Sequence, residues 1–350
     1  MIFTISATSR FLGYIRMTSR KLKSFLLTVA LAASGAVSAQ TTLLNASYDV
    51  AREFYKDYNP AFVAHYKKTT GKDVKIDQAH GGSSAQARAV NDGLAADVVT
   101  MNTTTDIEFL AGNGVVAKDW AKKFPYDASP TTSTMLFLVR NGNPKNIKDW
   151  SDLAKPGVQV IVVNPKTGGN GRYAYLAAWG SVREKGGTDA QAAEFVKQLY
   201  KNVPVLGKGG RDATAIFLQR NIGDVLITFE SEVLSIEREF GQGKVDAVYP
   251  ATSIVAENPV AVVERTVAKK GTGELAKAYL DYLYSDEAQE IAAKHALRPR
   301  SEAVLKKHAA LFKPLKQFTV AQYFGSLGEA QKVHFNDGGQ FDKLYTPGVK

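Results

Sequence analysis

The sequence predicts an α/β protein built from two lobes with largely parallel sheets. Short runs rich in β-branched residues alternate with longer helical stretches along the chain, a pattern typical of α/β architecture. A chain of 350 residues is long enough for two lobes, and its 45% of hydrophobic residues can supply a core for each. Because the chain has no cysteine, neither disulfides nor thiolate metal sites contribute to this fold.

The first 39 residues have the order of a secretory signal peptide. A basic cluster at 20–23 precedes the apolar run 25–33, and small residues follow at 37–39. The apolar run is shorter than the roughly 20 residues that a transmembrane helix needs. We expect removal of residues 1–39, so that the exported protein begins at Gln40. The formal charge of +10 includes five basic residues and no acidic residue in this segment, which leaves +5 for the remainder.

Seven runs are predicted to be strands, with loops and helices between them. They are 43–48, 74–76, 97–101, 135–140, 158–163, 203–206 and 225–229. Helical periodicity follows the first strand at 50–69, and Pro60 is expected either to break this helix or to open its second half. A second helix is expected at 84–94.

Two hydrophobic runs bounded by turn residues are candidates to cross between the lobes. They lie at 133–140 and 258–263 and bracket about 120 residues. If both cross, the first lobe is discontinuous and contains 40–132 and 259–350. The second lobe then contains 133–258.

Three glycine-rich loops stand between a predicted strand and a predicted helix. The first glycine loop is 80–84, the second is 164–172 and the third is 207–212. The first N–H groups of a helix have no partner within the helix and carry partial positive charge. Glycine lets a ligand approach the backbone closely, and open α/β sheets gather such loops at the carboxyl ends of their strands. The three loops together favour one anion site, with helix N termini of two lobes facing each other.

Other functional classes have weaker support. None of the loops has the spacing of a P-loop or a dinucleotide fingerprint, and the basic residues form no concentrated face for nucleic acid. The five histidines show no His-x-x-x-His pair and no Gly-x-Ser-x-Gly elbow occurs, so neither a helical metal site nor a serine hydrolase is indicated. We expect His80 to pack on its neighbours. Glu230 and Glu232 are expected to be solvated or paired with arginine.

The loops and several other segments resemble the sulfate/thiosulfate-binding protein family. The resemblance spans essentially the whole chain after residue 39, in order. The matching segments are 43–49, 76–83, 164–172, 175–180, 222–227, 278–285 and 298–300. It implies a two-lobed type II periplasmic binding fold that closes on a dehydrated oxyanion, without a cofactor or a metal.

The resemblance also implies the residues of the site. The ligand-binding positions are the backbone and hydroxyl of Ser83, the backbone N–H groups of Gly168, Gly169, Asn170 and Gly210, and position 229, where this chain has Phe229. Asp49, Arg172 and Arg211 match family residues that are expected to steady the loops rather than to neutralise the anion.

The chain departs from the family pattern at three positions. The family usually has Ser where Gly168 stands and Ala where Gly171 stands, so one hydroxyl donor is missing. Sulfate-type members usually have Trp where Phe229 stands, and Phe cannot donate a hydrogen bond. The sequence around Phe229 looks more like the thiosulfate-type members. Sulfate and thiosulfate therefore both remain open.

The function implied by the resemblance is that of a periplasmic, monomeric solute-binding protein. It would capture sulfate or thiosulfate and deliver the anion to the membrane permease of an ABC importer. Sulfate presents only acceptors, whereas phosphate keeps a proton that a donor-only pocket would leave unpaired, at about 1–3 kcal/mol. A related oxyanion, such as molybdate or an organosulfur anion, is the alternative. A periplasmic enzyme lacks a visible nucleophile, base or metal set.

Overall fold

The computed structural model describes residues 40–345, apart from 234–235 and 237–242. The expected signal peptide at 1–39 lies outside the described residues. No described helix is long and apolar enough to cross a membrane.

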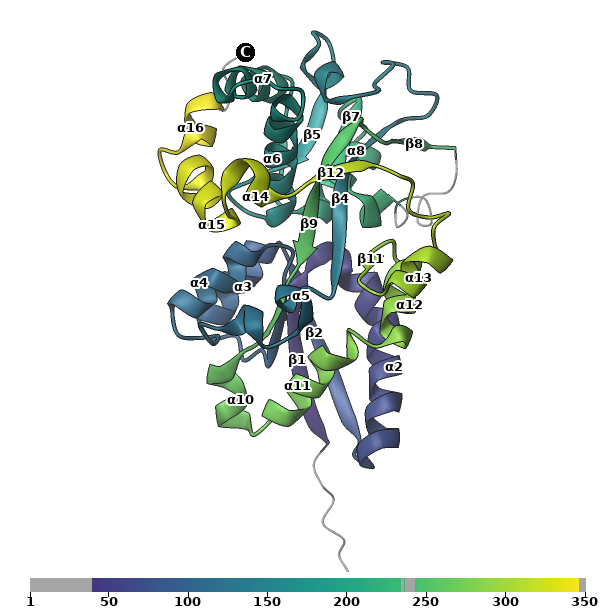
Figure 1. Ribbon diagram of the computed structural model, residues 1–350, viewed down its shortest axis with the longest axis vertical. Helices are drawn as coiled ribbons and strands as arrows, with labels where there is room; N and C mark the ends of the chain where they lie inside the picture. Colours follow the sequence, from purple (N-terminus) through teal and green to yellow (C-terminus); the bar gives the residue numbers. More distant parts are fainter. Residues whose placement is uncertain (1–39, 234–235, 237–242, 346–350) are drawn as a thin grey trace, which may run out of the picture. The chain divides into compact units, whose positions relative to one another are not determined.

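The first sheet has four strands in the order β10-β3-β1-β2 (Figure 1). Strands β1, β2 and β3 are parallel, while β10 pairs antiparallel with β3 at the edge. The strands are β1 (Thr41–Tyr48), β2 (Val74–Gly81), β3 (Val98–Thr100) and β10 (Val260–Val262). The helical elements of this part of the chain are η1 (Asp49–Ala51), α2 (Arg52–Thr70), α3 (Ser83–Asn91), α4 (Thr104–Gly112), η2 (Trp120–Lys122), α5 (Pro125–Ala128), α10 (Glu264–Lys270), α11 (Gly273–Tyr282), α12 (Asp286–Lys294) and α13 (Glu302–Lys307).

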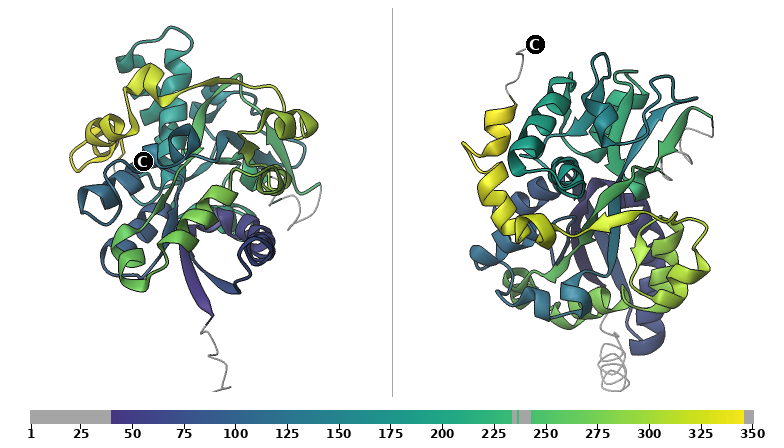
Figure 2. Two further views of the ribbon diagram at one scale, coloured as in Figure 1. Left: turned by 60° about the horizontal axis from the view of Figure 1, so that its bottom comes forward. Right: turned by 45° about the horizontal axis from the view of Figure 1, so that its top comes forward.

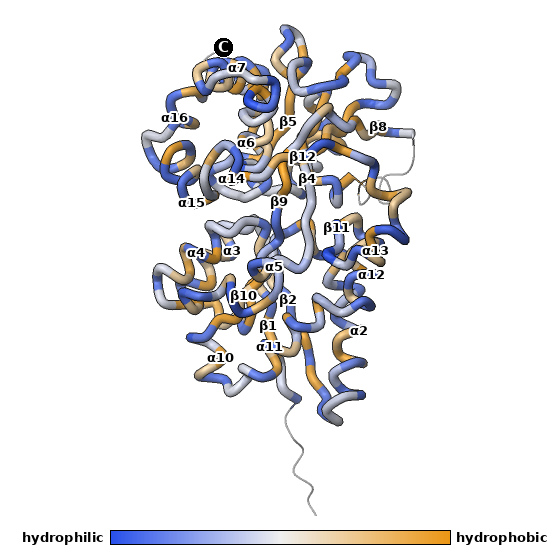
Figure 3. Tube along the Cα trace, viewed as in Figure 1, coloured by the Kyte–Doolittle hydropathy of each residue, from blue (hydrophilic) through white to orange (hydrophobic). Residues whose placement is uncertain are grey.

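Helix α2 continues across Pro60, so the break considered from the sequence is absent. Tyr58 and Phe62, four residues apart, are fully buried on one face of the helix and both pack edge-to-face on Tyr279 of α11. Figure 3 shows α2 with hydrophobic residues alternating with hydrophilic ones. Burial of this face holds the helix together despite the hydrogen bond that proline removes.

The second sheet follows the order β12-β9-β4-β7-β5-β6, and β8 and β11 also pair with β4. Its strands are β4 (Thr131–Arg140), β5 (Val160–Val163), β6 (Leu206–Gly207), β7 (Val225–Phe229), β8 (Val245–Val248), β9 (Thr252–Asn258), β11 (Arg298–Pro299) and β12 (Lys316–Phe318). Strand β4 runs antiparallel to β7, β8, β9 and β11, so this sheet is mixed. The expectation of largely parallel sheets was wrong here, because neighbouring antiparallel strands do not need helical crossovers.

The helices of the second sheet include the C-terminal segment. They are η3 (Trp150–Ala154), α6 (Gly169–Arg183), α7 (Asp189–Lys201), α8 (Gly210–Leu218), α14 (Val320–Phe324), α15 (Leu327–Ala330), η4 (Gln331–Phe335) and α16 (Gln340–Leu344). The C-terminal helices lie beside α6 and α7 in both views (Figures 1 and 2).

The two cores are separate, and the C-terminal segment joins the second of them. Tyr58 and Tyr279 belong to the core of the first sheet. Phe318, Phe324 and Phe341 are buried with the residues of the second sheet, and β12 pairs with β9 there. This packing differs from the expected assignment of all of 259–350 to the first lobe.

The chain passes between the sheets at three points, the last of which lies between α13 and β12, where the C-terminal segment returns to the second sheet. Only Pro259 separates β9 of the second sheet from β10 of the first. Strand β4 begins directly after Ser129 and Pro130, which follow α5. Pro259 lies within the predicted run 258–263, whereas Ser129 and Pro130 precede the predicted run 133–140.

Candidate anion site at three helix N termini

The three glycine loops meet at one place. A Cβ atom on Gly82 of the first loop would lie 3.3 Å from the carbonyl oxygen of Thr167 and 3.5 Å from that of Lys208. A Cβ atom on Gly209 of the third loop would lie 3.8 Å from Gly82 Cα. Thr167 Oγ1 also donates a hydrogen bond to the Lys208 carbonyl oxygen at 3.0 Å, which joins the second loop to the third. The structure therefore brings together backbone segments from both sheets.

Each loop leads directly into the first turn of a helix. The N-cap positions of α3, α6 and α8 are Gly82, Gly168 and Gly209. Glycine has no side chain that could cap these helices. A capping side chain would normally accept from an N–H group of the first turn. In its absence, N–H groups of these first turns can bind another acceptor, with the exception of the Arg211 N–H, which donates to Asp49 Oδ2.

Ser83 is the first residue of α3 and is 1% exposed. Its hydroxyl accepts a hydrogen bond from the backbone N–H of Asn102 at 3.3 Å. The hydroxyl hydrogen points toward the Met101 sulfur, 3.5 Å away, which is a weak acceptor. Ser83 thus has a donor that a stronger acceptor can take over.

Glycine is required at two positions of the second loop. A Cβ atom on Gly169 would lie 2.2 Å from Asn102 Oδ1 and 3.0 Å from Thr103 Cγ2. A Cβ atom on Gly171 would lie 2.3 Å from the carbonyl oxygen of Val163. Gly168 differs, because the nearest atom to its Cβ position is Val163 Cγ1 at an ordinary 3.6 Å. The first turn of α6 therefore packs closely on its surroundings except at Gly168, where a side chain fits.

Asn170 is buried in the first turn of α6 and is 3% exposed. Neither the oxygen nor the nitrogen of its side-chain amide has a partner among the described residues. A buried amide without partners costs free energy unless a ligand or water satisfies it. Asn170 therefore offers a side-chain donor in addition to its backbone N–H.

Arg172 connects the second glycine loop to α3 and α4 of the first sheet. Its Nη1 donates to Thr105 Oγ1 at 2.8 Å and to Asp106 Oδ1 at 3.3 Å, and its Nη2 donates to Ser84 Oγ at 3.0 Å. Its Nε donates to the carbonyl oxygen of Pro165 at 3.2 Å. Because these protein acceptors engage the guanidinium, Arg172 braces the loops rather than offering its charge to a ligand.

Asp49 connects β1 to the third glycine loop. Its Oδ2 accepts from the backbone N–H of Arg211 at 3.2 Å, and a Cβ atom on Gly209 would lie 2.8 Å from the same oxygen. Burial raises the pKa of Asp49, and the hydrogen bonds from the N–H groups of Arg211 and Val50 oppose this shift. The Arg211 side chain extends toward Glu53, with 3.9 Å between Nη2 and Oε1.

Glu232 lies against the third glycine loop, which the sequence did not suggest. Its Oε2 would be 3.1 Å from a Cβ atom on Gly210. The carboxyl group accepts hydrogen bonds from Thr214 Oγ1 at 2.7 Å and from the Thr228 hydroxyl. Burial raises the pKa of Glu232 to about 7, with a smaller contribution from Asp49. The expectation of a solvated Glu232 was wrong because the end of β7 turns into the interior.

Glu230 lies two residues earlier and is paired with Arg298 of β11. Pairing with arginine was one of the two roles expected for this residue. Arg298 Nε and Nη2 donate to Oε2 and Oε1 of Glu230 at 2.7 and 3.0 Å. His80 also packs on its neighbours as expected, with its Nδ1 3.3 Å from the Tyr48 carbonyl oxygen. Burial lowers the pKa of His80, so the imidazole stays neutral.

Phe229 ends β7 and is 2% exposed. Its ring packs edge-to-face on Tyr173 in the early part of α6, with 6.2 Å between the ring centroids. Phe229 therefore supports the start of α6 through an apolar contact and donates no hydrogen bond.

The loop between β3 and α4 was missed in the sequence although it contacts the site. Asn102 and Thr103 touch Gly169, while Thr105 and Asp106 bind Arg172. This loop has the same order of strand, loop and helix as the other three. The loop between β3 and α4 lacks glycine, and glycine was the feature by which the sequence identified the other three loops.

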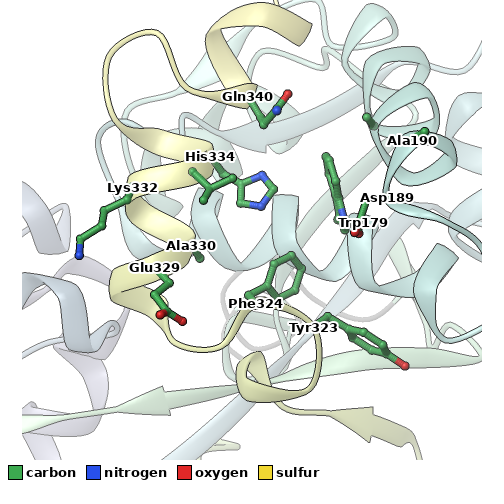
Figure 4. A pocket seen from close by; sticks show the side chains of 12 residues that line it. Trp179, Asp189, Ala190, Tyr323, Phe324, Glu329, Ala330, Lys332, His334 and Gln340 are labelled. Atoms are coloured by element: carbon green, nitrogen blue, oxygen red, sulfur yellow. Dashed lines mark hydrogen bonds between the residues drawn. The ribbon is translucent and has the colours of Figure 1, made fainter.

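A separate cavity of about 710 Å³ lies between α6, α7 and the C-terminal helices. Figure 4 shows the His334 imidazole directed toward Trp179 across this cavity. Burial lowers the pKa of His334 to about 4. None of the lining residues belongs to the glycine loops, so this cavity is not part of the anion site. Among the described residues, no group of three or more His, Cys, Asp or Glu is arranged to hold a metal ion.

Comparison with known proteins gives the family. A model of the family described as bacterial extracellular solute-binding protein matches residues 43–298. The thiosulfate-binding protein of Pseudomonas aeruginosa is 54% identical over 329 residues, covering 94% of this chain and 99% of that protein. This chain belongs to the sulfate/thiosulfate-binding protein family.

Other members of the sulfate/thiosulfate-binding family agree along nearly the whole chain. The sulfate-binding protein of Escherichia coli is 50% identical over 319 residues, covering 91% of this chain and 97% of that protein. The solved structure of SubI, a sulfate-binding protein of Mycobacterium tuberculosis, has a TM-score of 0.77 and 33% identity, covering 84% of this chain and 99% of SubI. The expected two-lobed type II fold is confirmed, and so is the expectation of a binding protein rather than an enzyme.

Proposed function

We propose that this protein captures sulfate or thiosulfate outside the cytoplasmic membrane and delivers it to the permease of an ABC importer. The observation that carries the proposal is the meeting of three glycine-capped helix N termini, contributed by both sheets. Helix N termini bind anions through free N–H groups and partial positive charge. The relatives with 54% and 50% identity are named for these two anions.

The proposed ligand contacts are hydrogen-bond donors and one apolar wall. They comprise the N–H and hydroxyl of Ser83, the N–H groups of Gly168, Gly169, Asn170 and Gly210, and the wall formed by Phe229. Sulfate has acceptors only, so peptide and hydroxyl donors can satisfy it without a buried cation and its desolvation cost. We assign Asp49, Arg172 and Arg211 to holding the loops. The engaged donors of Arg172 and the Asp49 bond to the Arg211 N–H support this assignment.

Two positions favour a site that accepts thiosulfate as well as sulfate. Gly168 leaves the space of a side chain unfilled, with Val163 Cγ1 3.6 Å from its Cβ position. Phe229 provides an apolar ring. A hydrogen-bond donor at this position would instead favour sulfate, which has four equivalent oxygens. The terminal sulfur of thiosulfate is larger and a weaker acceptor than oxygen, and both features suit it.

We further propose export through the signal peptide at 1–39, a periplasmic location and action as a monomer. The permease would contact both lobes of the closed protein. For the lobes, we propose boundaries at the crossings near 132 and 259, and a third between α13 and β12. The packing of 316–345 on the second core supports assigning that segment to the second lobe.

Isothermal titration calorimetry tests the function. Sulfate and thiosulfate should each bind the purified protein, with a stoichiometry of about one per chain, while phosphate gives no heat. Ser83→Ala should weaken sulfate binding by about 1.5 kcal/mol, roughly tenfold, because one hydrogen bond to the charged ligand is lost while the backbone donors remain. Tighter binding of molybdate than of both sulfur oxyanions would support the alternative ligand. The absence of binding heat with every one of these anions would refute the proposal.

A further inference from the structure

The second glycine loop contains a lysine whose ammonium group is bound by the C-terminal segment. Lys166 lies two residues before Gly168. Its Nζ donates to Asp342 Oδ2 at 2.8 Å, to Asp337 Oδ1 at 3.3 Å and to the carbonyl oxygen of Asn336 at 3.2 Å. An ammonium group has three donors, so the C-terminal segment satisfies all of them.

The acceptors of Lys166 are held in place by their own contacts. Asp342 Oδ2 also accepts from the backbone N–H of Gly338 at 2.8 Å, which closes the turn before α16. Phe341, the neighbour of Asp342, is 4% exposed and packs edge-to-face on Tyr200 of α7, with 5.3 Å between ring centroids. The hydrogen bond from Lys166 is the main reason that the pKa of Asp342 is lowered, so the carboxylate remains charged at neutral pH.

A lysine without these partners would change how the site chooses anions. Lysine carries a compact charge on a long, flexible side chain. An unneutralised charge within a Debye length of about 10 Å attracts every anion, whether or not the anion fits the peptide donors. Paired with the two carboxylates of Asp337 and Asp342, the same lysine adds no net positive field, and selection depends more on the geometry of the donors.

We propose that Asp342, together with Asp337, is a specificity-determining residue of the anion site, because it neutralises Lys166 and holds its ammonium group away from the ligand. This inference rests on the proposed function, since it assigns a role around the same loops. It gives the C-terminal segment a part in ligand selection in addition to its packing on the second core.

The test uses substitutions that keep shape and hydrogen bonding while removing charge. Asp342→Asn retains an oxygen that can accept from the Gly338 N–H, and Asp337→Asn/Asp342→Asn removes both carboxylates. Lys166→Met provides the background in which no charge is released. Lys208→Met is the comparison for a lysine outside any described ion pair, because Lys208 precedes Gly210 by two residues, as Lys166 precedes Gly168. Its loss should weaken sulfate binding at low salt and have little effect at high salt.

Calorimetry with sulfate and inorganic phosphate should be carried out at about 0.01 M and about 1 M salt, where the Debye length is about 30 and 3 Å. We expect the double Asn variant to bind sulfate roughly three- to tenfold more tightly at low salt and to lose this gain at high salt. Phosphate should compete with sulfate more strongly than in the wild type. In the Lys166→Met background the Asn substitutions should give a smaller gain, because they then remove only the repulsion of the two carboxylates.

Three results would overturn the inference. The first is a double Asn variant with the wild-type affinity and salt dependence. The second is an affinity that falls equally at both salt concentrations, which would show that the segment only supports the loop. The third is a gain of the same size in the Lys166→Met background, which would show that removing the carboxylates accounts for the whole effect. A wild-type protein that binds no sulfur oxyanion would instead refute the proposed function, and the two failures are thereby distinguished.

Discussion

Arg172 Nη1 lies 2.8 Å from Thr105 Oγ1 and joins the first turn of α6 to the first turn of α4. These helices belong to different sheets, so the contact fastens one glycine loop to the opposite side of the site. The same guanidinium reaches Ser84 next to the first glycine loop. The relative positions of two loops therefore depend on one planar group.

The first prediction concerns Arg172→Lys. Lysine keeps the charge but cannot donate to Thr105, Ser84 and the Pro165 carbonyl oxygen at once. We expect sulfate affinity to fall by about tenfold or more, equivalent to roughly 1.4 kcal/mol or more, measured by calorimetry. Arg183→Lys, at the other end of the same helix, is the control and should bind as the wild type does. Equal affinities for the two variants would contradict a bracing role for Arg172.

The second prediction compares neighbouring glycines. Gly169→Val should abolish binding, because even a Cβ atom there would lie 2.2 Å from Asn102 Oδ1. Gly168→Ser should fold normally, since the nearest atom to its Cβ position is 3.6 Å away. The added hydroxyl should strengthen sulfate binding by about 1 kcal/mol, roughly fivefold. Titration of both variants checks the pair, and wild-type affinity in Gly169→Val would remove the second loop from the site.

The third prediction is a pH dependence of stability due to Glu232. Burial raises the pKa of Glu232 from 4.5 to about 7 in the folded protein. The folded state therefore binds its proton more tightly, so this contribution to stability is complete below about pH 4.5 and is lost as the pH rises through about 7. The loss amounts to roughly 3 kcal/mol.

The Glu232→Gln variant should not show this loss of stability at rising pH. Urea unfolding at both ends of the pH range should show that the variant gains stability relative to the wild type as the pH rises. Glu257→Gln, at a half-buried position that pairs with Arg300, serves as the control. A constant free-energy difference between wild type and Glu232→Gln across this range would show that the carboxyl group is ionised throughout.

The fourth prediction concerns acid unfolding and His334. Burial lowers the pKa of His334 from 6.5 to about 4, and its Nδ1 is 3.1 Å from the Tyr175 hydroxyl. A group with a lowered pKa stabilises the fold above about pH 6.5 and loses that contribution as the pH falls through about 4. The free energy of unfolding of His334→Gln should therefore fall by roughly 3 kcal/mol less than that of the wild type between these pH values. Parallel loss of stability in both proteins, followed by circular dichroism, would contradict this assignment.

The local pattern of the sequence predicted the elements that carry the site. The strand 225–229 has the bounds that were expected, and the helices after the three glycine loops begin within a few residues of their predicted starts. Strands, loops and helix starts depend on residues close together in the chain, which is why composition and glycine spacing sufficed. The resemblance to the sulfate/thiosulfate-binding family likewise needed only the sequence.

Tertiary structure alone decided the features that depend on distant partners. Phe318, Phe324 and Phe341 are apolar residues that either core could have buried, so no local pattern assigned them to the second. Burial of Glu232 and the ion pairs of Lys166 with the C-terminal segment likewise join residues far apart in sequence. Hydrophobic burial has no direction, and charge pairing depends on distance in space, so only the packed chain settles both.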